Sequence, residues 1–277
     1  MPKREEIRIR DPFILTDHKN DCYYMYGTTS LEEGSTRAGS TFSVYKSYDL
    51  ESFCEPKVIF DGRENGFWAD RDYWAAEVHE YRGRYYLFGS CKADGKCRAT
   101  HVFVSDIPDG RFVPLTTEPI TPHGWECLDG TLVIEDGRPY IVFCREWVQV
   151  GDGEIYALEL SEDLTEPIGD PFLLFRASES PDVEPIPGHQ ASYVTDGPFL
   201  YREDGRLKMI WSSLGQGRYL VLGAESDSIR GNWVQKGSVF DFDGGHAMIF
   251  DRLDGTRTLA LHSPNETGLE RAVFLEL

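Results

Sequence analysis

The sequence lacks the long apolar runs that would place it in a membrane. No stretch of its 277 residues stays apolar over the roughly 20 positions that a transmembrane helix needs. The N-terminal residues MPKREEIRIRDP contain no apolar segment of a secretion signal. We therefore expect a cytoplasmic protein that does not bind membranes, or a secreted one if a leader was removed ahead of this sequence.

Basic residues are also scarce. Lys and Arg together number 28 and Asp and Glu together number 47, so the formal net charge is −19. The sequence contains no run of Lys or Arg that could neutralise phosphate groups. Because a negatively charged protein repels nucleic acids and anionic lipids, both are excluded as partners, and a neutral substrate is expected.

Paired cysteine motifs are absent too. Six cysteines occur, and no two of them have the Cys-x-x-Cys spacing of a zinc or thioredoxin-like site. A chain of this length buries a sizeable core, so it does not need a disulfide framework. No organic cofactor is implied by any motif. The cysteines are Cys22, Cys54, Cys91, Cys97, Cys127 and Cys144.

Helical periodicity is nearly absent, and short apolar runs separated by Gly, Pro, Asp and Asn recur instead. Five groups of runs share one internal order: a strand with a polar start, a turn, an aromatic-rich strand and a third strand. A unit of about four strands repeated five times predicts an all-β five-bladed β-propeller with about four antiparallel strands per blade. The aromatic-rich strands begin at Cys22, Arg84, Pro139, Leu207 and Thr258.

No linker interrupts the repeats, so we expect a single domain over residues 1–277. The last repeat is short, and the strand around Ile7 to Ile9 is expected to complete it. The expected blades are 1–70, 71–122, 123–190, 191–241 and 242–277.

The polar starts of the first strands are the main candidates for chemistry. The innermost strands of a propeller line its central channel, so residues at their entry ends converge despite their distance in sequence. Carboxylates forced into one pocket repel one another, which separates their pKa values and permits one acid and one base. Glycoside hydrolysis needs such a pair. The converging residues are Asp11, Glu77, Asp129, Asp196 and His246.

The motifs around these residues resemble glycoside hydrolase family 43 in all five repeats. The resemblance implies a five-bladed propeller and inverting hydrolysis of terminal arabinofuranosyl, xylosyl or related residues. It makes Asp11 the general base, Asp129 the carboxylate that tunes the acid and orients the substrate, and Asp196 the acid. The motifs are Arg10-Asp11-Pro12-Phe13-Ile14, Trp74-Ala75-Ala76-Glu77-Val78-His79, Leu128-Asp129-Gly130, Thr195-Asp196-Gly197-Pro198-Phe199 and Gly245-His246-Ala247-Met248.

The sequence departs from the family pattern at the acid. The family usually has Glu in this Gly-Pro motif, whereas this chain has Asp196, which is one methylene shorter. Either the pocket brings Asp196 closer to the leaving oxygen, or Glu77 or Glu146 serves as the acid. A catalytically impaired propeller that only binds carbohydrate is the alternative from another class.

Further residues are candidates for substrate binding, and each has a structural alternative. Aromatic faces suit the apolar side of a sugar ring, but they equally suit packing between blades. Glu77 could instead pair with an arginine. The resemblance places His246 near the channel axis, in contact with water or a bound structural cation, although no ligand set with metal spacing is present. The substrate-binding candidates are Phe13, Trp74, Glu77, Glu146, Trp147 and His246, and Trp68 is a further candidate floor for a sugar.

The sequence therefore predicts an exo-acting, inverting glycoside hydrolase. Its expected substrates are oligosaccharides or plant polysaccharides that carry terminal α-L-arabinofuranosyl, β-D-galactofuranosyl or β-D-xylosyl residues. A phosphorolytic enzyme would need a cluster of Arg or Lys beside the carboxylates, and no such cluster is visible in the sequence.

Overall fold

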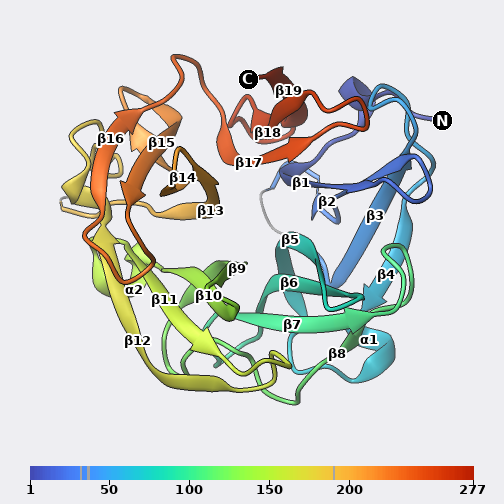
Figure 1. The fold of residues 1–277 in the computed structure, drawn as a ribbon, viewed down its shortest axis with the longest axis horizontal. Helices are drawn as coiled ribbons and strands as arrows, with labels where there is room; N and C mark the ends of the chain where they lie inside the picture. The colour runs from blue at the N-terminus through green and yellow to red at the C-terminus, as the bar shows by residue number, and fades with distance from the viewer. Residues whose placement is uncertain (32, 36–37, 190) are drawn as a thin grey trace.

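The computed structural model describes residues 1–31, 33–35, 38–189 and 191–277. Five antiparallel sheets surround one central axis, which confirms the predicted five-bladed β-propeller (Figure 1). Within each sheet, strands that follow one another in sequence are neighbours. The first strand of each sheet is innermost, so the five predicted polar starts all belong to strands around the axis.

The first sheet contains β1 (Arg10–Asp17), β2 (Cys22–Thr28), β3 (Thr41–Ser47) and β4 (Lys57–Asp61). The second contains β5 (Arg71–Tyr81), β6 (Arg84–Lys92), β7 (Ala99–Ser105) and β8 (Val113–Pro114). The third contains β9 (Cys127–Glu135), β10 (Arg138–Arg145), β11 (Glu154–Leu160) and β12 (Pro167–Arg176). The fourth contains β13 (Asp196–Glu203), β14 (Arg206–Gly215), β15 (Arg218–Ser226) and β16 (Val234–Ser238). The fifth contains β17 (Gly245–Asp251), β18 (Arg257–Ser263) and β19 (Arg271–Glu276).

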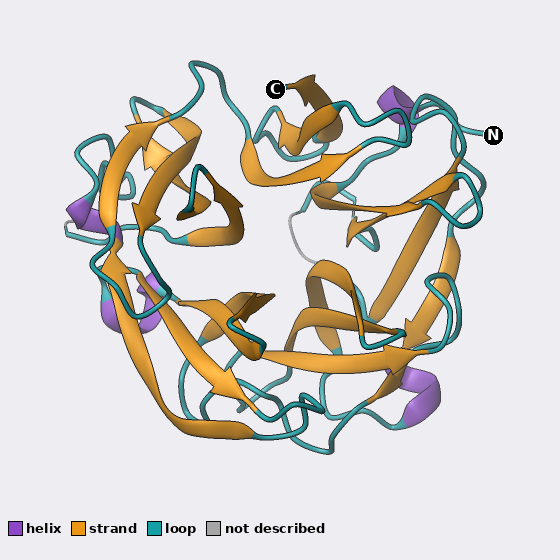
Figure 2. Ribbon diagram, viewed as in Figure 1, coloured by secondary structure: helices purple, strands orange, loops and turns teal. Residues whose placement is uncertain are grey.

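The helical segments have only three or four residues and lie between strands (Figure 2). None of the helices among the described residues is long and apolar enough to cross a membrane. They are η1 (Arg4–Glu6), α1 (Gly62–Asn65), α2 (Trp147–Val150) and η2 (Ala177–Glu179).

The fifth sheet has three strands, so the prediction that residues around Ile7 to Ile9 complete it is wrong. Among the described residues, this segment contributes one backbone hydrogen bond to the last blade, from Ile9 N–H to the Glu270 carbonyl at 3.3 Å. Ile7 and Ile9 are instead buried in the core beside the first blade. The segment closes the ring by packing, without forming a strand.

Each innermost strand starts with the same bulge. Between two successive pairing positions it advances three residues while its neighbour advances two, as from Arg10 to Phe13 opposite Thr28 to Tyr26. The residue after the first pairing position has a positive φ, between 48° and 55°. Such a φ is uncommon outside glycine, and bulges of this kind redirect side chains. The bulge residues are Asp11, Ala75, Asp129, Gly197 and His246, and the residues just before them are Arg10, Trp74, Leu128, Asp196 and Gly245.

Candidate active site

A cavity of about 160 Å³ lies at the axis, where the innermost strands begin. With one exception, its lining comes from the bulge positions and the positions just before them, and all five sheets contribute. The exception is Thr28, at the end of β2. Because the same bulge recurs five times, it collects residues from distant parts of the sequence around one space. The lining residues are Arg10, Asp11, Thr28, Trp74, Leu128, Asp129, Asp196 and His246.

Hydrogen bonds between neighbouring blades hold four of the bulges. The N–H of each bulge residue donates to a side chain from the second strand of the preceding blade. The bonds are Ala75 N–H to Thr28 Oγ1 at 2.8 Å, Asp129 N–H to Ser90 Oγ at 2.9 Å, His246 N–H to Ser212 Oγ at 2.8 Å and Asp11 N–H to His262 Nδ1 at 3.1 Å.

The fourth blade differs, and the difference fixes Asp129. The residue equivalent to Thr28 in the third blade is Cys144, which pairs with Leu128 as Thr28 pairs with Arg10. A thiol is a weak acceptor. The N–H of the bulge residue Gly197 donates instead to Asp129 Oδ2 at 2.9 Å. The Asp129 carboxylate thus takes the structural place that a hydroxyl or, for Asp11, an imidazole nitrogen holds elsewhere in the ring.

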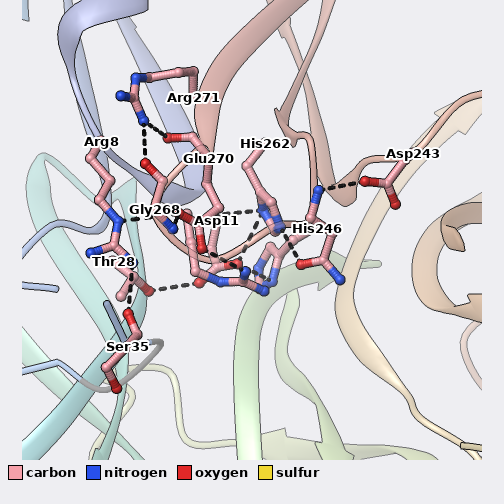
Figure 3. Close-up of polar contacts among 12 residues, drawn as sticks. Arg8, Asp11, Thr28, Ser35, Asp243, His246, His262, Gly268, Glu270 and Arg271 are labelled. Atoms are coloured by element: carbon pink, nitrogen blue, oxygen red, sulfur yellow. Dashed lines mark hydrogen bonds and ion pairs between the residues drawn. The ribbon is translucent and has the colours of Figure 1, made fainter. Parts of the chain in front are cut away.

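Asp11 is held by contacts that favour its ionised form (Figure 3). Thr28 Oγ1 donates to Asp11 Oδ2 at 2.6 Å, and His246 Nδ1 lies 3.2 Å from Asp11 Oδ1. Burial alone would raise the pKa of Asp11. The interactions with His246 and Arg10 and the Thr28 hydrogen bond contribute to outweighing that effect, so the pKa lies below its ordinary value.

The pKa values of the two histidines beside Asp11 are shifted in opposite directions. Burial lowers the pKa of His262 to about 4, so its neutral Nδ1 accepts the Asp11 N–H. Burial acts in the same direction on His246, but Asp11, Asp129 and Glu77 raise the pKa of His246 above its ordinary value. His246 lies between Asp11 and Asp129, with Nδ1 3.7 Å from Asp129 Oδ2.

The guanidinium group of Arg10 is held by an ion pair with Glu270, which is outside the cavity lining. Its Nη1 lies 3.3 Å from Glu270 Oε1. Arg8 Nε lies 3.1 Å from Glu270 Oε2 (Figure 3). The side chain of Glu270 is fully buried, so it needs both guanidinium groups to compensate its charge. This arrangement keeps the guanidinium of Arg10 beside Asp11.

Asp129 and Asp196 are the two carboxyl groups of the cavity whose pKa values are raised. Burial, with the nearby charges of Asp196 and Asp11, raises the pKa of Asp129 to about 8, although His246 opposes the shift. Burial also raises the pKa of Asp196 to about 6 against the opposing effects of His246 and Tyr219. Because the two carboxyls interact, their titrations belong to the pair. One cavity therefore holds a carboxyl group with a lowered pKa, Asp11, beside two carboxyl groups with raised pKa values, Asp129 and Asp196.

Tyr219 fixes the orientation of Asp196. Its hydroxyl donates to Asp196 Oδ2 at 3.0 Å, and its ring stacks on His262 with centroids 5.6 Å apart. A Cβ on Gly245 would lie 2.3 Å from the Tyr219 ring, so the glycine provides the space for the phenol. The buried tyrosine links the acid side of the cavity to the histidine that holds Asp11.

The structure places the other predicted site residues outside the cavity lining. Glu77 is two residues beyond the bulge residue Ala75, and its Oε2 lies 3.0 Å from His79 Nε2 rather than beside an arginine. Phe13 is buried and packs against the His79 ring at 5.0 Å. Glu146 and Trp147 belong to the connection after β10 and have partners of their own.

Glu146 Oε1 accepts a hydrogen bond from Arg98 Nε at 2.7 Å, and burial raises the pKa of Glu146. The Trp147 ring meets the His189 ring edge-on, at 5.2 Å between centroids. Of the predicted substrate-binding residues, the structure brings Trp74 and His246 into the cavity with Asp11, Asp129 and Asp196.

The expected cation near His246 finds no ligand set. Over the described residues, no three His, Cys, Asp or Glu side chains are grouped so as to hold a metal ion. His246 directs Nδ1 toward Asp11 Oδ1 at 3.2 Å and Asp129 Oδ2 at 3.7 Å. No step of the chemistry below passes through a metal.

Sequence reasoning missed Thr28, Tyr219 and His262. A signal for two of them was present, because the aromatic-rich strands carry equivalent residues at their ends, Thr28, Ser90, Cys144, Ser212 and His262. Most of these offer a hydrogen-bond acceptor to the next blade. Tyr219 had no counterpart in the repeats that could have identified it.

Comparison with solved structures agrees with this architecture. The endo-arabinase from Bacteroides thetaiotaomicron VPI-5482 is 41% identical, with a TM-score of 0.91 over 99% of this chain and 96% of that one. An α-L-arabinofuranosidase from Lactobacillus brevis is 16% identical, with a TM-score of 0.76 over 99% and 94% of the two chains. A β-xylosidase/α-arabinofuranosidase from a compost microbial metagenome is 18% identical, with a TM-score of 0.74 over 100% and 93%. No curated protein matches the sequence.

A five-bladed propeller with one carboxyl group of lowered pKa and two of raised pKa at its axis has the acid and base groups that glycoside hydrolysis needs. The model of the protein family Glycosyl hydrolases family 43 matches residues 6–277. The chain therefore belongs to this family. It is a glycoside hydrolase, and its substrate is a carbohydrate.

Proposed function

We propose that the protein hydrolyses α-L-arabinofuranosyl linkages with inversion of the anomeric configuration. The observation that carries this proposal is that one cavity contains Asp11, whose pKa is lowered, and the pair Asp129 and Asp196, whose pKa values are raised. Inverting hydrolysis needs one carboxylate to accept a proton from water and one carboxyl group to protonate the leaving oxygen.

In this mechanism a water molecule attacks the anomeric carbon while Asp11 accepts its proton. The bond from that carbon to the glycosidic oxygen breaks, and Asp196 transfers its proton to the departing oxygen. Asp129 accepts a hydrogen bond from Gly197 N–H and faces His246, and these contacts hold it in place to orient the substrate. A proton exchange with solvent then restores Asp11 and Asp196 for the next cycle.

Two contacts favour Asp196 over the alternative acids. Glu146 is committed to Arg98, and Glu77 to His79, whereas Asp196 lines the cavity and has a pKa raised to about 6. Its position just before the bulge also differs from that of Asp11 and Asp129. The shorter Asp side chain therefore reaches the cavity from another point of the strand.

The substrate assignment is supported by the 41% identical neighbour, which is described as an endo-arabinase. Exo action is the first candidate, because a cavity of about 160 Å³ suits a single terminal unit. Endo action is the second candidate, and the same neighbour favours it. Xylosyl and galactofuranosyl units are the remaining alternatives.

A panel of nitrophenyl glycosides tests the assignment. We expect hydrolysis of the α-L-arabinofuranoside to exceed that of β-D-xyloside and β-D-galactofuranoside, with the first released sugar observed by NMR in the inverted configuration. Products from linear arabinan separate the two modes of action, since exo action releases arabinose alone from the earliest times. Retention of configuration, or a covalent glycosyl adduct, contradicts inversion.

The role of Tyr219 makes a prediction about pH dependence. Asp196 must be protonated to act as the acid, so activity falls as the pH rises through the titration of the Asp196 and Asp129 pair, between about pH 6 and about pH 8. The Tyr219 hydrogen bond lowers the pKa of Asp196. Tyr219→Phe should therefore raise that pKa and move the alkaline limb upward by about 0.5–1 pH unit, the equivalent of one net hydrogen bond.

Tyr201→Phe is the matched control, because Tyr201 lies on the same strand as Asp196 but outside the cavity lining. Its pH profile should equal that of the wild type. A Tyr219→Phe profile that falls in height without moving along the pH axis would assign Tyr219 a purely structural role.

A further inference from the structure

A second cavity opens beside the active site, with a volume of about 320 Å³. Two tryptophans, Trp68 and Trp125, are among its lining residues, and both are half-buried. Lys96, Glu118 and His123 line it with exposed polar side chains. We call it the Trp68–Trp125 cavity. Aromatic walls with a few polar groups are the usual composition of a small-molecule site.

The topology places this cavity on the face of the propeller where the catalytic cavity opens. Trp68 precedes β5 and Trp125 precedes β9, and both strands begin on the side where Trp74 and Asp129 enter the catalytic cavity. Lys96 and Cys97 lie between β6 and β7, which is a connection on the same side because successive strands are antiparallel.

Arg98 and Trp74 form a layer that connects residues lining the two cavities. The Arg98 guanidinium lies 3.7 Å above the Trp74 ring, and Trp74 lines the catalytic cavity. Cys97 and Ala99, on either side of Arg98, line the second cavity. Arg98 is held by Glu146 at 2.7 Å, so this layer has a fixed geometry.

The indole of Trp68 is fixed before any ligand binds. Its Nε1–H donates to His101 Nδ1 at 3.3 Å, and His101 Nε2 lies 3.1 Å from the Thr116 carbonyl. Burial lowers the pKa of His101 to about 4, so the ring stays neutral and donates through Nε2 while accepting through Nδ1. A pre-positioned ring loses little conformational entropy on binding.

Trp125 is fixed by neighbours of a different kind. The Arg145 guanidinium lies 4.0 Å from the centre of its ring, and the Tyr156 ring packs edge-on against it with centroids 4.9 Å apart. Trp68 and Trp125 are therefore rigid aromatic elements on two sides of one opening.

We propose that the Trp68–Trp125 cavity binds a sugar unit of the substrate chain that is distant from the cleaved bond. A neutral sugar fits the chemistry, because its C–H face can pack on an indole while its hydroxyls meet the polar groups of Lys96, Glu118 and His123. The net charge of −19 disfavours an anionic occupant. This inference rests on the proposed function, since it assigns the cavity to the same glycan.

Binding to the Asp11→Asn protein tests the proposal without turnover. Linear α-1,5-arabino-oligosaccharides and β-1,4-xylo-oligosaccharides of two to six units are the probes, measured by calorimetry. We expect affinity to rise with chain length in one series. In this background, Trp68→Ala should lower the affinity for the longest oligosaccharide about tenfold. The affinity for the shortest one should stay unchanged.

Two variants separate binding from folding. Trp68→Phe keeps an aromatic ring at the site and should regain most of the affinity for the long chain. Tyr48→Ala removes an exposed aromatic residue at the end of β3, on the opposite face, and should change nothing. Activity of the single Trp68→Ala protein on the nitrophenyl arabinofuranoside should equal that of the wild type.

The outcomes distinguish this proposal from the proposed function. Affinity independent of chain length in both series, or an equal loss for short and long chains, overturns the assignment of the cavity even if the nitrophenyl arabinofuranoside is hydrolysed. Failure to hydrolyse that glycoside overturns the arabinofuranosyl assignment. Length- and Trp68-dependent binding of the xylo-oligosaccharides would still support the cavity as a glycan site.

Discussion

Asp11→Asn should lower turnover by about 10²–10⁴-fold, the usual contribution of a general base, while the protein stays folded and still binds sugar. The amide has nearly the same shape as the carboxylate, and its oxygen can still accept the hydrogen bond from Thr28. It cannot accept a proton from the attacking water. The loss should therefore appear in kcat, with KM almost unchanged.

The substitution also removes a charge that His246 faces. The Asp11 carboxylate is the largest of the influences that raise the pKa of His246, so that pKa should fall in the variant. NMR titration of the histidine measures this shift independently of activity. Asp106→Asn, at an exposed aspartate outside the cavity, is the control and should leave both turnover and titration unchanged.

Turnover at the wild-type level in Asp11→Asn would remove Asp11 from the mechanism. Loss of the folded state, detected by a fall in the thermal unfolding temperature, would mean that the carboxylate chiefly stabilises the bulge at the start of β1.

The fold could be predicted because the repeat is visible in the sequence. Each aromatic-rich run is the second strand of a sheet, and each polar start is an innermost strand, so five similar groups give five blades. Asp11, Asp129 and His246 could be predicted as neighbours for the same reason. They occupy the same bulge position in three different blades.

The register of the other two blades could not be predicted in this way. Treating Glu77 and Asp196 as equivalents of Asp11 ignores the extra residue that the bulge inserts, and the true equivalents are Ala75 and Gly197. Displacement by one residue changes the direction of a side chain in a strand. Asp196 reaches the cavity from the position before the bulge, and Glu77 lies beyond it beside His79.

Contacts between blades were beyond sequence reasoning for another reason. Tyr219 belongs to the fourth blade but packs on His262 of the fifth, in the space left by Gly245. A contact of this kind occurs once in the ring, so comparison of the five repeats in the sequence does not reveal it. The network around Asp11 and Asp196 therefore needs coordinates.

Asp196→Ala should affect substrates according to their leaving groups. With an arabino-oligosaccharide the departing alkoxide needs a proton, so loss of the acid should cost about 10²–10⁴-fold in kcat/KM. A nitrophenolate departs with little protonic help, so the nitrophenyl arabinofuranoside should lose far less. The alkaline limb of the pH profile should flatten on the nitrophenyl substrate, because the group whose deprotonation causes it is gone.

Two additional measurements identify the acid. Azide should restore activity to Asp196→Ala, because a small anion can occupy the space left by the carboxyl group. Asp196→Glu restores the residue that the family usually has, and it should retain the leaving-group dependence of the wild type. An equal loss on activated and unactivated substrates would assign Asp196 to binding or structure.

The same series on Glu77→Gln and Glu146→Gln separates Asp196 from its rivals. Both amides keep the side-chain length and a hydrogen-bond acceptor for His79 or Arg98, so the protein should remain folded. Because neither side chain lines the cavity, neither variant should show a loss that grows with the basicity of the leaving group. If one of them does so and Asp196→Ala does not, that glutamate is the acid, and the division of pKa values at the axis serves to orient substrate instead.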